Sequence, residues 1–241
     1  MRTMGIITAR AGSRGVPGKN IRELRDKPVV AYTMEAALAA NTIDRVVLTT
    51  NDSYVSTIAQ EYDLTVIDRP DHLATDSARI DDALRHCCLE VSREYGFLAD
   101  IIVLLYANIP VRAHDIIDRV VDKIIESGAD SVQSMAPVGK FHPYWLYKLE
   151  NDRATVYIEN NVYRRQNLPP VYSIDGAAAA VTLKSLMDSA EESDPHAFWG
   201  TDRRAVLQKT HDTVDIDSLR DFYLAEAILR EKAEGELKSL T

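Results

Sequence analysis

The chain has 241 residues, of which 46% are hydrophobic and 27% are charged, and its formal net charge is −9. A chain of this length can bury a core without disulfides or a structural metal, so it suits one α/β domain with a small appendage. The negative charge argues against nucleic acid as the main partner. No apolar run approaches membrane-spanning length, and the first residues lack the apolar stretch of a signal peptide, so we expect no membrane contact.

Apolar runs alternate with amphipathic stretches along the first half of the chain. We expect strands at 4–9, 45–50, 64–67, 100–106 and 130–137, and helices at 28–40, 53–62, 77–94 and 113–127. This alternation is typical of βαβ units and predicts an α/β fold with a mostly parallel sheet. Asp76 or Ser77 is placed to cap the third helix.

The pattern changes between residues 138 and 170. Aromatic, polar and proline residues replace helical periodicity there, which predicts a hairpin-rich insertion whose aromatic side chains suit an interface. Core elements resume at 176–183, continue with a strand at 205–208 and end in an amphipathic helix at about 218–234. The sequence thus predicts a core made of 1–137 and 171–241 and an insertion made of 138–170.

The two cysteines, Cys87 and Cys88, are neighbours within a predicted helix. A disulfide between adjacent residues would strain the backbone, so both thiols are expected to be free. Free thiols favour a reducing compartment, and we therefore expect a cytoplasmic protein.

A glycine-rich basic loop directly follows the first strand. Residues 10–27 contain six cationic and two acidic side chains, and Arg10, Arg14 and Lys19 alternate with glycines. Glycine lets backbone N–H groups approach an anion, and arginine and lysine donate charge-assisted hydrogen bonds to phosphate. The spacing matches neither the GxxxxGK[ST] nor the GxGxxG motif. The alternatives are a solvated charged loop and a purely structural glycine loop.

Asp215 and Asp217 form an acidic pair near the C-terminus. In an extended segment, residues two apart lie on the same face, so the two carboxylates can converge. Paired carboxylates suit Mg²⁺, which also binds phosphate. The alternative is that Asp217 or Ser218 caps the last helix.

The loop ITARAGSRGVPGKNI at 7–21 resembles the signature of the acylneuraminate cytidylyltransferase family. Five further motifs of that family occur in order, namely RPDHLATD at 69–76, LLYANIPVR at 104–112, RQNLPP at 165–170, DGA at 175–177 and VDID at 214–217. The chain is therefore identified as a divergent member of the family. The related Kdo cytidylyltransferases usually carry Lys-Pro where this chain has Lys19-Asn20.

The resemblance implies a Rossmann-like nucleotidyltransferase sheet with helices on both faces. It also implies transfer of CMP from CTP to the anomeric hydroxyl of a nonulosonic, sialic-acid-like acid, with Mg²⁺ as cofactor and release of pyrophosphate. The expected catalytic residues are Arg10, Lys19, Asp215 and Asp217, the last two as metal ligands. The expected nucleotide contacts are Ala9, Arg10, Ala11, Gly12, Ser13, Arg14, Lys19, Asn20, Arg69, Ala78 and Asn108.

Two arginines within these motifs could have structural roles. Arg69 resembles a nucleotide contact of the family, but it could instead pair with Asp68 or Asp71. Arg112 is expected to be structural.

The resemblance further implies that the insertion is a dimerisation arm whose arginine reaches the partner's active site, so that a homodimer shares its sites. The expected sugar contacts are Tyr106, Arg165, Gln166, Asp175 and Gly176. Further candidates in the insertion are Lys140, His142, Tyr144 and Trp145, of which Trp145 suits an interface better than a ligand contact.

Departures from the family pattern gather on the sugar side. Tyr106 stands where relatives usually carry glutamine, and Ser173-Ile174-Asp175 replaces Arg-Pro-Asn. Asn51 replaces an aspartate after the second strand, whereas the phosphate loop and the acidic pair are intact. These residues favour a nonulosonic acid other than N-acetylneuraminate. A Kdo-type or other sugar nucleotidyltransferase and a catalytically silent nucleotide-binding subunit are the alternatives.

Overall fold

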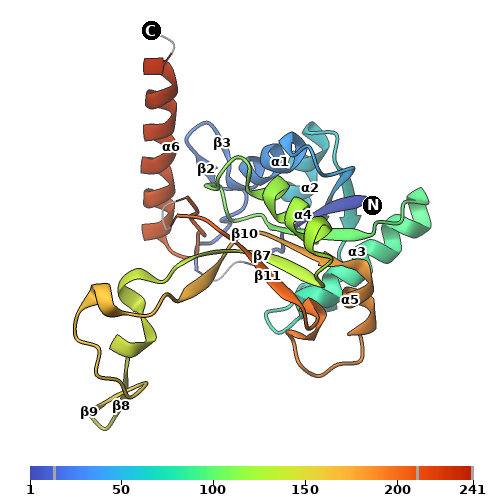
Figure 1. Ribbon diagram of the computed structural model, residues 1–241. Helices are drawn as coiled ribbons and strands as arrows, with labels where there is room; N and C mark the ends of the chain where they lie inside the picture. Colours follow the sequence, from blue (N-terminus) through green and yellow to red (C-terminus); the bar gives the residue numbers. More distant parts are fainter. Residues whose placement is uncertain (13–14, 210–211, 240–241) are drawn as a thin grey trace.

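The protein is built around one seven-stranded sheet (Figure 1), seen in a computed structural model that describes residues 1–12, 15–209 and 212–239. In spatial order the strands are β11 (Arg203–Leu207), β7 (Ser131–Pro137), β10 (Tyr172–Thr182), β6 (Ile101–Tyr106), β1 (Thr3–Thr8), β4 (Arg45–Thr50) and β5 (Thr65–Asp68). Within this sheet, β10 runs antiparallel to its neighbours β6 and β7, and the other pairings are parallel. The predicted mostly parallel α/β sheet is confirmed.

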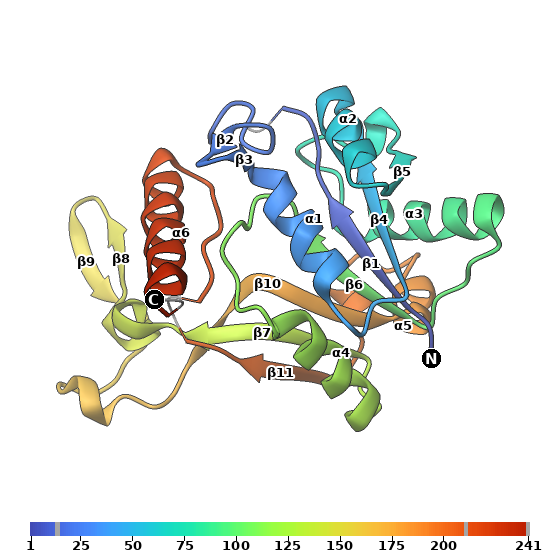
Figure 2. The ribbon, with the colours of Figure 1, turned by 90° about the horizontal axis from the view of Figure 1, so that it is seen from above.

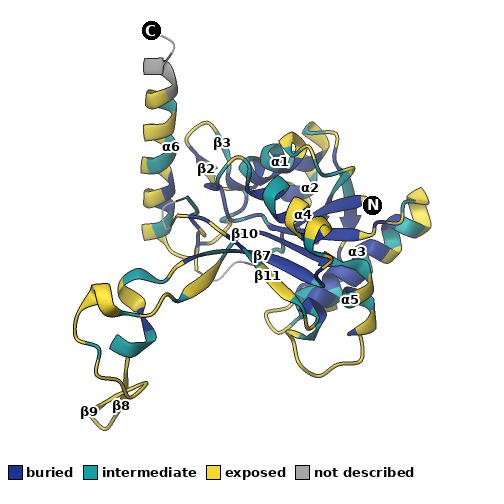
Figure 3. Cartoon of the chain, viewed as in Figure 1, coloured by how far each residue is buried: buried dark blue, intermediate teal, exposed yellow. Residues whose placement is uncertain are grey.

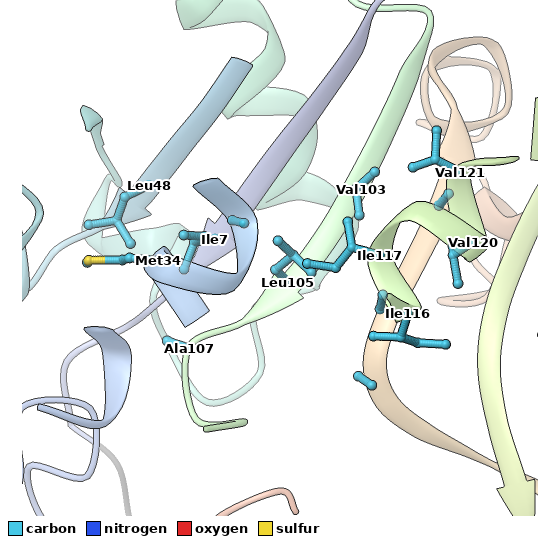
Figure 4. Packing of buried hydrophobic residues seen from close by; sticks show 14 of the residues in the cluster. Ile7, Met34, Leu48, Val103, Leu105, Ala107, Ile116, Ile117, Val120 and Val121 are labelled. Carbon is cyan, nitrogen blue, oxygen red and sulfur yellow. The ribbon is translucent and has the colours of Figure 1, made fainter. Parts of the chain in front are cut away.

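Helices cover both faces of the sheet (Figure 2). The helices α1 (Val29–Ala39), α2 (Ser53–Glu61) and α4 (Ile116–Ser127) pack on one face, and α3 (Ile80–Tyr95) and α5 (Leu183–Asp188) pack on the other. Neighbouring residues of a strand point to opposite faces. Accordingly, Ile7 and Leu105 belong to the first apolar cluster, shown in Figure 4, whereas Ile6 and Leu104 belong to the second.

The apolar run at 100–106 forms the buried strand β6. Residues Ile101 to Leu105 are at most 1% exposed, because helices cover them on both sides. Replacing one such leucine or isoleucine with alanine costs about 2–5 kcal/mol of stability. The core therefore holds β6 rigidly, together with the turn that follows it.

The carboxyl ends of β1 and β6 lie next to each other, since Thr8 pairs with Tyr106. After β1 the chain crosses through α1 to β4 on one side, whereas β6 lies on the other side of β1. In open α/β sheets such a reversal of strand order marks the ligand crevice. The basic loop after β1 and the turn after β6 both open into this crevice.

The last helix, α6 (Leu219–Ser239), packs beside the basic loop. A third apolar cluster joins Val16 of the loop, Ile216 of the acidic segment and Phe222 of α6. The small hairpin of β2 (Glu23–Leu24) and β3 (Lys27–Pro28) also contacts α6, where Arg25 donates a 2.7 Å hydrogen bond to the carbonyl of Leu229. The basic loop and the segment that leads into α6 are thus packed together at the crevice.

An arm projects from the sheet between β7 and β10 (Figure 1). It consists of η2 (Gly139–Phe141), η3 (Pro143–Trp145), the hairpin β8 (Tyr147–Glu150) and β9 (Arg153–Val156), and η4 (Arg165–Asn167). Every residue of β8 and β9 is exposed (Figure 3). A two-stranded hairpin is marginal in water unless it packs on something, so this arm lacks a covering surface within one chain.

Several boundaries differ from the sequence-based prediction. The helix expected at 77–94 begins at Ile80, and its N-cap Arg79 makes no side-chain capping hydrogen bond. The predicted cap by Asp76 or Ser77 was therefore wrong. The helix expected to begin at 113 begins at Ile116, and the hairpin β2–β3 and the helix α5 were not predicted. The short helices η1 (Asp71–Leu73) and η5 (Ala197–Trp199) complete the chain.

Among the described residues, no helix combines the length and apolarity needed to cross a membrane. Both cysteines are buried and free.

Candidate active site

A cleft of about 330 Å³ opens at the carboxyl ends of β1 and β6. Its lining residues are Thr8, Arg10, Gly15, Lys19, Asn20, Arg69, Ile80, Tyr106, Asn108 and Asp217. The residues come from every motif on the nucleotide side, although these motifs are up to about 200 residues apart in sequence. The fold therefore brings the basic loop and the acidic segment to one place.

Lys19 connects the basic loop with the acidic segment inside this cleft. Its Nζ donates a 2.9 Å hydrogen bond to Oδ1 of Asp217 and a 2.8 Å hydrogen bond to the carbonyl of Ile216. The Lys19 side chain is 16% exposed and that of Asp217 is 75% exposed. The ammonium is thus held in place by protein oxygens, while the carboxylate still faces the open cleft.

Gly15 allows the basic loop to approach the acidic segment. A Cβ at this position would lie 2.0 Å from the backbone carbonyl oxygen of Asp217, a distance that no side chain can occupy. The neighbouring Val16 is fully buried against Ile216. The loop glycine is thus required by close packing of backbone on backbone, and a larger residue there would separate the loop from Asp217.

The acidic segment is held extended against the turn after β6. Val214 donates its backbone N–H to the carbonyl of Val111, and Ile216 donates to the carbonyl of Asn108. The Asn108 amide also donates to a carboxylate oxygen of Asp215. This pairing places Asp215 and Asp217 beside the cleft on the same short extended stretch.

The Asp215 carboxyl group is destabilised in its charged form. Although the residue is exposed, partial loss of water around the carboxylate, followed by the negative charge of Asp217, raises its pKa to about 6, against the opposing charge of Lys19. Two carboxylates that repel each other in this way would be stabilised by a nearby positive charge. Asp217 is also free of any capping function, because Ser218 precedes α6 and exchanges hydrogen bonds with Asp221. Ser218 is therefore the residue that caps α6, and the Asp217 carboxylate pairs with Lys19.

Arg10 occupies the other end of the basic loop. Its Nη2 donates a 2.7 Å hydrogen bond to Oδ1 of Asp76, and both side chains are about 40% exposed or less. The backbone N–H of Ala11 donates to Oδ1 of Asn51, which ties the loop to the end of β4. Gly12 has φ +77°, a left-handed conformation that favours glycine. The site thus contains Asp76 and Asn51, which sequence reasoning had placed elsewhere.

Arg69 lies buried at the back of the cleft with 6% of its surface exposed. Its Nη2 donates a 2.8 Å hydrogen bond to the carbonyl of Thr49, and no ion pair with Asp68 or Asp71 forms among the described residues. Burial lowers its pKa to about 10, so the guanidinium remains charged at neutral pH. A buried cation that lines a cleft without a carboxylate partner suits an electron-rich ligand group.

Asn20 lines the cleft with an unused acceptor. The residue is 7% exposed, and its Oδ1 is buried with no hydrogen-bond partner in the part of the chain that the structure describes. Buried polar atoms are rarely left unpaired. A ligand hydroxyl, such as one from a ribose, would satisfy this oxygen.

The remaining predicted nucleotide contacts lie around the loop. Ala9 is buried and its N–H donates to the carbonyl of Thr49, whereas Ala78 is half-buried in the turn before α3. Neither residue lines the cleft, although Ile80, just after Ala78, does. Ser13 and Arg14 lie outside the described residues.

Tyr106 forms the wall of the cleft toward β10. Burial, and to a smaller degree the charge of Asp215, raises the pKa of its hydroxyl. Gly176 packs behind the ring, because a Cβ there would lie 3.7 Å from Tyr106 Cδ2 and 2.9 Å from Ile109 Cδ1. The buried Arg112 donates to the carbonyls of Tyr106 and Ala177, which confirms its predicted structural part.

Of the five predicted sugar contacts only Tyr106 lines the cleft of the described chain, and Gly176, which packs behind its ring, does not. Asp175 does not line it, and its carboxylate accepts hydrogen bonds from Ser134, Gln208 and the Ala177 N–H. Arg165 and Gln166 lie exposed in η4 of the arm. Figure 1 shows the arm projecting from the body of the molecule beyond the end of β7.

The other arm candidates form a local cluster. His142 is 3% exposed and bonds through its ring nitrogens to the Pro169 carbonyl and the Tyr144 N–H, so its ring is occupied. Tyr144 stacks edge-on against it at 5.0 Å between ring centroids, and Trp145 is half-buried. Lys140 contacts the exposed ring of Phe141.

The acidic pair offers two carboxylates beside the cleft as oxygen ligands for a metal ion. Among the described residues, no group of three or more His, Cys, Asp or Glu side chains is arranged to enclose a metal ion. Magnesium commonly needs only one or two protein carboxylates, since water and substrate phosphates supply the remaining ligands. The two repelling carboxylates of Asp215 and Asp217 fit that kind of ion.

Sequence reasoning missed several lining residues. Thr8 and Ile80 reach the cleft from the end of β1 and the first turn of α3. Thr8 is the last residue of the first strand, and that position is the only signal that could have marked it. Nothing in the sequence marked Ile80 as a lining residue, because an apolar residue at the start of a helix is normally expected in the hydrophobic core.

The doubly wound sheet, with its basic loop after β1 and an acidic pair facing it, defines a nucleotidyltransferase. A family model described as "Cytidylyltransferase" matches residues 4–195, and the chain belongs to the cytidylyltransferase family. The family resemblance drawn from the six motifs is thereby confirmed.

Two curated relatives match nearly the whole chain. The CMP-N,N'-diacetyllegionaminic acid synthase of Legionella pneumophila is 26% identical over 241 residues, covering 98% of this chain and 99% of that protein. The N-acylneuraminate cytidylyltransferase of Escherichia coli O18:K1:H7 is 29% identical over 238 residues, covering 96% of this chain but 54% of that protein. The chain thus spans about half of the second relative.

A solved structure shares the fold. The CMP:2-keto-3-deoxy-manno-octonic acid synthetase, solved in complex with CTP, superposes with a TM-score of 0.73 at 18% identity, covering 96% of this chain and all of that one. The predicted Rossmann-like nucleotidyltransferase fold is confirmed by this likeness.

Proposed function

We propose that this cytidylyltransferase transfers CMP from CTP to the anomeric hydroxyl of a nonulosonic acid and releases pyrophosphate. The observation that carries the proposal is the contact of Lys19 with Asp217, two residues that line the same cleft, while Asp215 lies two positions before Asp217 and accepts a hydrogen bond from Asn108, which also lines the cleft. Relatives named for legionaminic acid and for N-acylneuraminate support an acceptor of this class.

The cations of the loop are suited to stabilise the departing pyrophosphate. Negative charge builds on the leaving group during in-line attack on the α-phosphorus, and fixed cations near it lower the barrier. Lys19 is held in the cleft by two hydrogen bonds, and Arg10 lies at its rim. Positioning and charge neutralisation then account for catalysis, and no side chain among the described lining residues is placed as an evident general base.

We propose Mg²⁺ as the cofactor, held by Asp215 and Asp217. The support is the acidic pair itself, because Asp217 raises the pKa of Asp215 and a divalent cation relieves that repulsion. When bound, the ion supplies positive charge that neutralises phosphate oxygens. Lys19 and Asn108, which contact the same two aspartates, would orient the carboxylates.

We further propose a homodimer in which the arm of one chain completes the sugar side of the other. The support is the exposure of apolar side chains along the arm, such as Leu149 at 74% and Tyr163 at 91%. Arg165 and Gln166 lie on this arm and would act on the partner's cleft. Tyr106, in place of a polar residue, favours an acceptor that differs from N-acetylneuraminate. The two buried thiols are free, which supports a cytoplasmic location.

Product analysis tests this function. The enzyme is incubated with CTP, Mg²⁺ and a panel of nonulosonic acids and Kdo, and the products are identified by mass spectrometry. We expect a CMP adduct of one nonulosonic acid with stoichiometric pyrophosphate. An adduct of Kdo alone would establish the Kdo-type alternative, and CTP binding without any adduct would establish a silent nucleotide-binding subunit.

A further inference from the structure

The carboxylate of Asp175 is fully engaged by groups outside the cleft. Its Oδ1 accepts a 2.5 Å hydrogen bond from the Ser134 hydroxyl and a 3.1 Å hydrogen bond from the Ala177 N–H. Its Oδ2 accepts a 2.5 Å hydrogen bond from Nε2 of Gln208. A carboxylate with three donors is well satisfied, so it has little left to offer a substrate. Its charge would also repel the carboxylate of a sugar acid.

The first part of this network fixes an irregular section of β10. The register between β10 and β7 shifts between Ile174 and Ala179, and Gly176 within this section has φ +75°. Asp175 bonds the section to Ser134 of β7. Bulges of this kind re-aim side chains beside functional sites. Here the bulge packs against Tyr106, because Gly176 lies behind its ring.

The second part reaches the acidic segment. Gln208 is 8% exposed, and its Nε2 donates both to Asp175 and, at 2.7 Å, to the hydroxyl of Thr213. Its Oε1 is buried without a hydrogen-bond partner among the described residues. The hydrogen bonds to Asp175 and Thr213 thus fix the orientation of the Gln208 amide, although they leave its oxygen without a hydrogen bond.

Thr213 directly precedes the extended stretch that carries the acidic pair. Val214 pairs with Val111 at the start of this stretch, and Asp215 follows. A continuous set of hydrogen bonds therefore runs from β7 through Asp175 and Gln208 to the residue two positions before Asp215. The same irregular section packs against Tyr106 through Gly176, so Asp175 is connected both to a lining residue of the cleft and to the segment that carries the acidic pair.

We propose that Asp175 is a positioning residue that acts through Gln208 and Thr213 on the acidic pair, and is not a sugar ligand. This inference rests on the proposed function, in which Asp215 and Asp217 hold the metal. It also explains why an acid stands here in place of the asparagine of the family pattern, since both of its oxygens accept hydrogen bonds, Oδ1 from Ser134 and Ala177 and Oδ2 from one N–H of Gln208.

The pairing of an acid with an amide permits an exchange experiment. Gln208→Glu places two carboxylates against each other, and Asp175→Asn faces one amide N–H group with another. The double variant, Asp175→Asn with Gln208→Glu, restores one acid and one amide with the direction of the hydrogen bond reversed. Its net charge equals that of the natural protein, and the carboxylate that it introduces at position 208 can also accept a hydrogen bond from the Thr213 hydroxyl.

Three measurements are made on the full-length protein and each variant. They are Mn²⁺ binding in the presence of CTP without acceptor, kcat and KM for the sugar acid, and the melting temperature. Gln208→Glu is expected to weaken Mn²⁺ binding and lower kcat by about tenfold or more, as the loss of hydrogen-bond partners around metal ligands usually does. The double variant is expected to recover most of both losses, with the KM for the sugar acid unchanged throughout.

Two outcomes would overturn the inference. A rise in the KM for the sugar acid in Asp175→Asn that Gln208→Glu does not reverse would show that Asp175 binds the sugar. A drop in melting temperature with Mn²⁺ binding unchanged would show a purely structural residue. If the natural protein turns over no sugar acid, the proposed function fails, and the Mn²⁺ measurements still decide whether Asp175 acts on the metal site.

Discussion

The nucleotide side of the cleft and the arm differ in whether their side chains already have partners within the chain. Around the basic loop, charged side chains already contact one another, as Lys19 does with Asp217 and Arg10 with Asp76. Along the arm, apolar side chains such as Leu149 and Tyr163 face solvent. One chain therefore preorganises the phosphate side, whereas these apolar side chains of the arm stay exposed in the described chain, as the proposed dimer would require. Variants on the two sides should consequently fail in different ways.

The largest effect is expected from removing the acidic pair. Asp215→Asn with Asp217→Asn takes away both metal-binding carboxylates and should lower Mg²⁺-dependent kcat by at least about a hundredfold. The fold should persist, since both aspartate side chains are exposed and the loss of like charges relieves repulsion. Pyrophosphate release measures the activity, and circular dichroism checks the fold. Near-normal turnover in this variant would remove the metal assignment.

The next effect concerns the loop cation. Lys19→Met removes the ammonium that we propose to stabilise the leaving group and should reduce kcat by roughly a hundredfold, with a smaller change in the KM for CTP. Lys27→Met is the matched control, because Lys27 belongs to the same basic segment but pairs with Glu35 away from the cleft. Steady-state kinetics with CTP compare the two. Equal losses in both variants would mean that the segment acts only through its overall charge.

A variant of the arm should leave the nucleotide side intact. Leu149→Glu with Tyr163→Glu places charges on the exposed apolar surface and should weaken self-association by about thirtyfold, which corresponds to ~2 kcal/mol. Sedimentation velocity measures the oligomeric state and calorimetry measures CTP binding. Leu89→Glu, on the exposed face of α3, is the control. A natural protein that is monomeric at all concentrations, with full activity, would contradict the arm's proposed function.

The smallest effect is a pH dependence from Asp215, whose pKa is raised to about 6. Protonation is favoured in the folded state, so without metal the folded protein loses stability as the pH rises through about 6. Asp215→Asn should therefore be slightly more stable than the natural protein at pH 7.5. The gain in free energy of unfolding, measured by thermal denaturation, should be less than ~1 kcal/mol because the group is partly exposed. The difference should vanish below about pH 4, where the aspartate is protonated in both states.

The same shift predicts how metal binding depends on pH. Mg²⁺ must displace the Asp215 proton below about pH 6, so its apparent affinity should fall by up to about tenfold for each pH unit below that value. Mg²⁺ titrations of activity between pH 5 and 8, values that bracket the pKa of about 6, measure this fall. An affinity that stays constant across this range would show that Asp215 does not bind the ion.

The sequence was sufficient for the central sheet and for the family. The uninterrupted apolar run of β6 and the strand–helix alternation predicted the sheet, and the six motifs predicted the family. Lys19 and Asp217, 198 positions apart, could be brought together only through the family resemblance, because no local pattern links them. The close approach of Gly15 to Asp217 was likewise hidden, since a loop glycine carries no sign of what it packs against.

The sequence was less informative where a side chain had two plausible partners. The sequence predicted that Asp76 caps a helix. In the structure α3 begins later, at Ile80, and the Asp76 carboxylate accepts a hydrogen bond from Arg10 instead. Asp175 aligned with a family sugar contact, yet it bonds to Ser134 and Gln208, which come from distant parts of the chain. Local propensity cannot rank such alternatives, because the deciding hydrogen bonds form only after the strands are assembled.

A crystal structure of the enzyme with CTP and Mn²⁺, located by anomalous scattering, tests the central claim most directly. We predict one ion bound by a carboxylate oxygen of Asp215 or Asp217 and by a phosphate oxygen, with the Lys19 ammonium on the same triphosphate. A triphosphate bound away from the basic loop, or an ion bound without either aspartate, would contradict it.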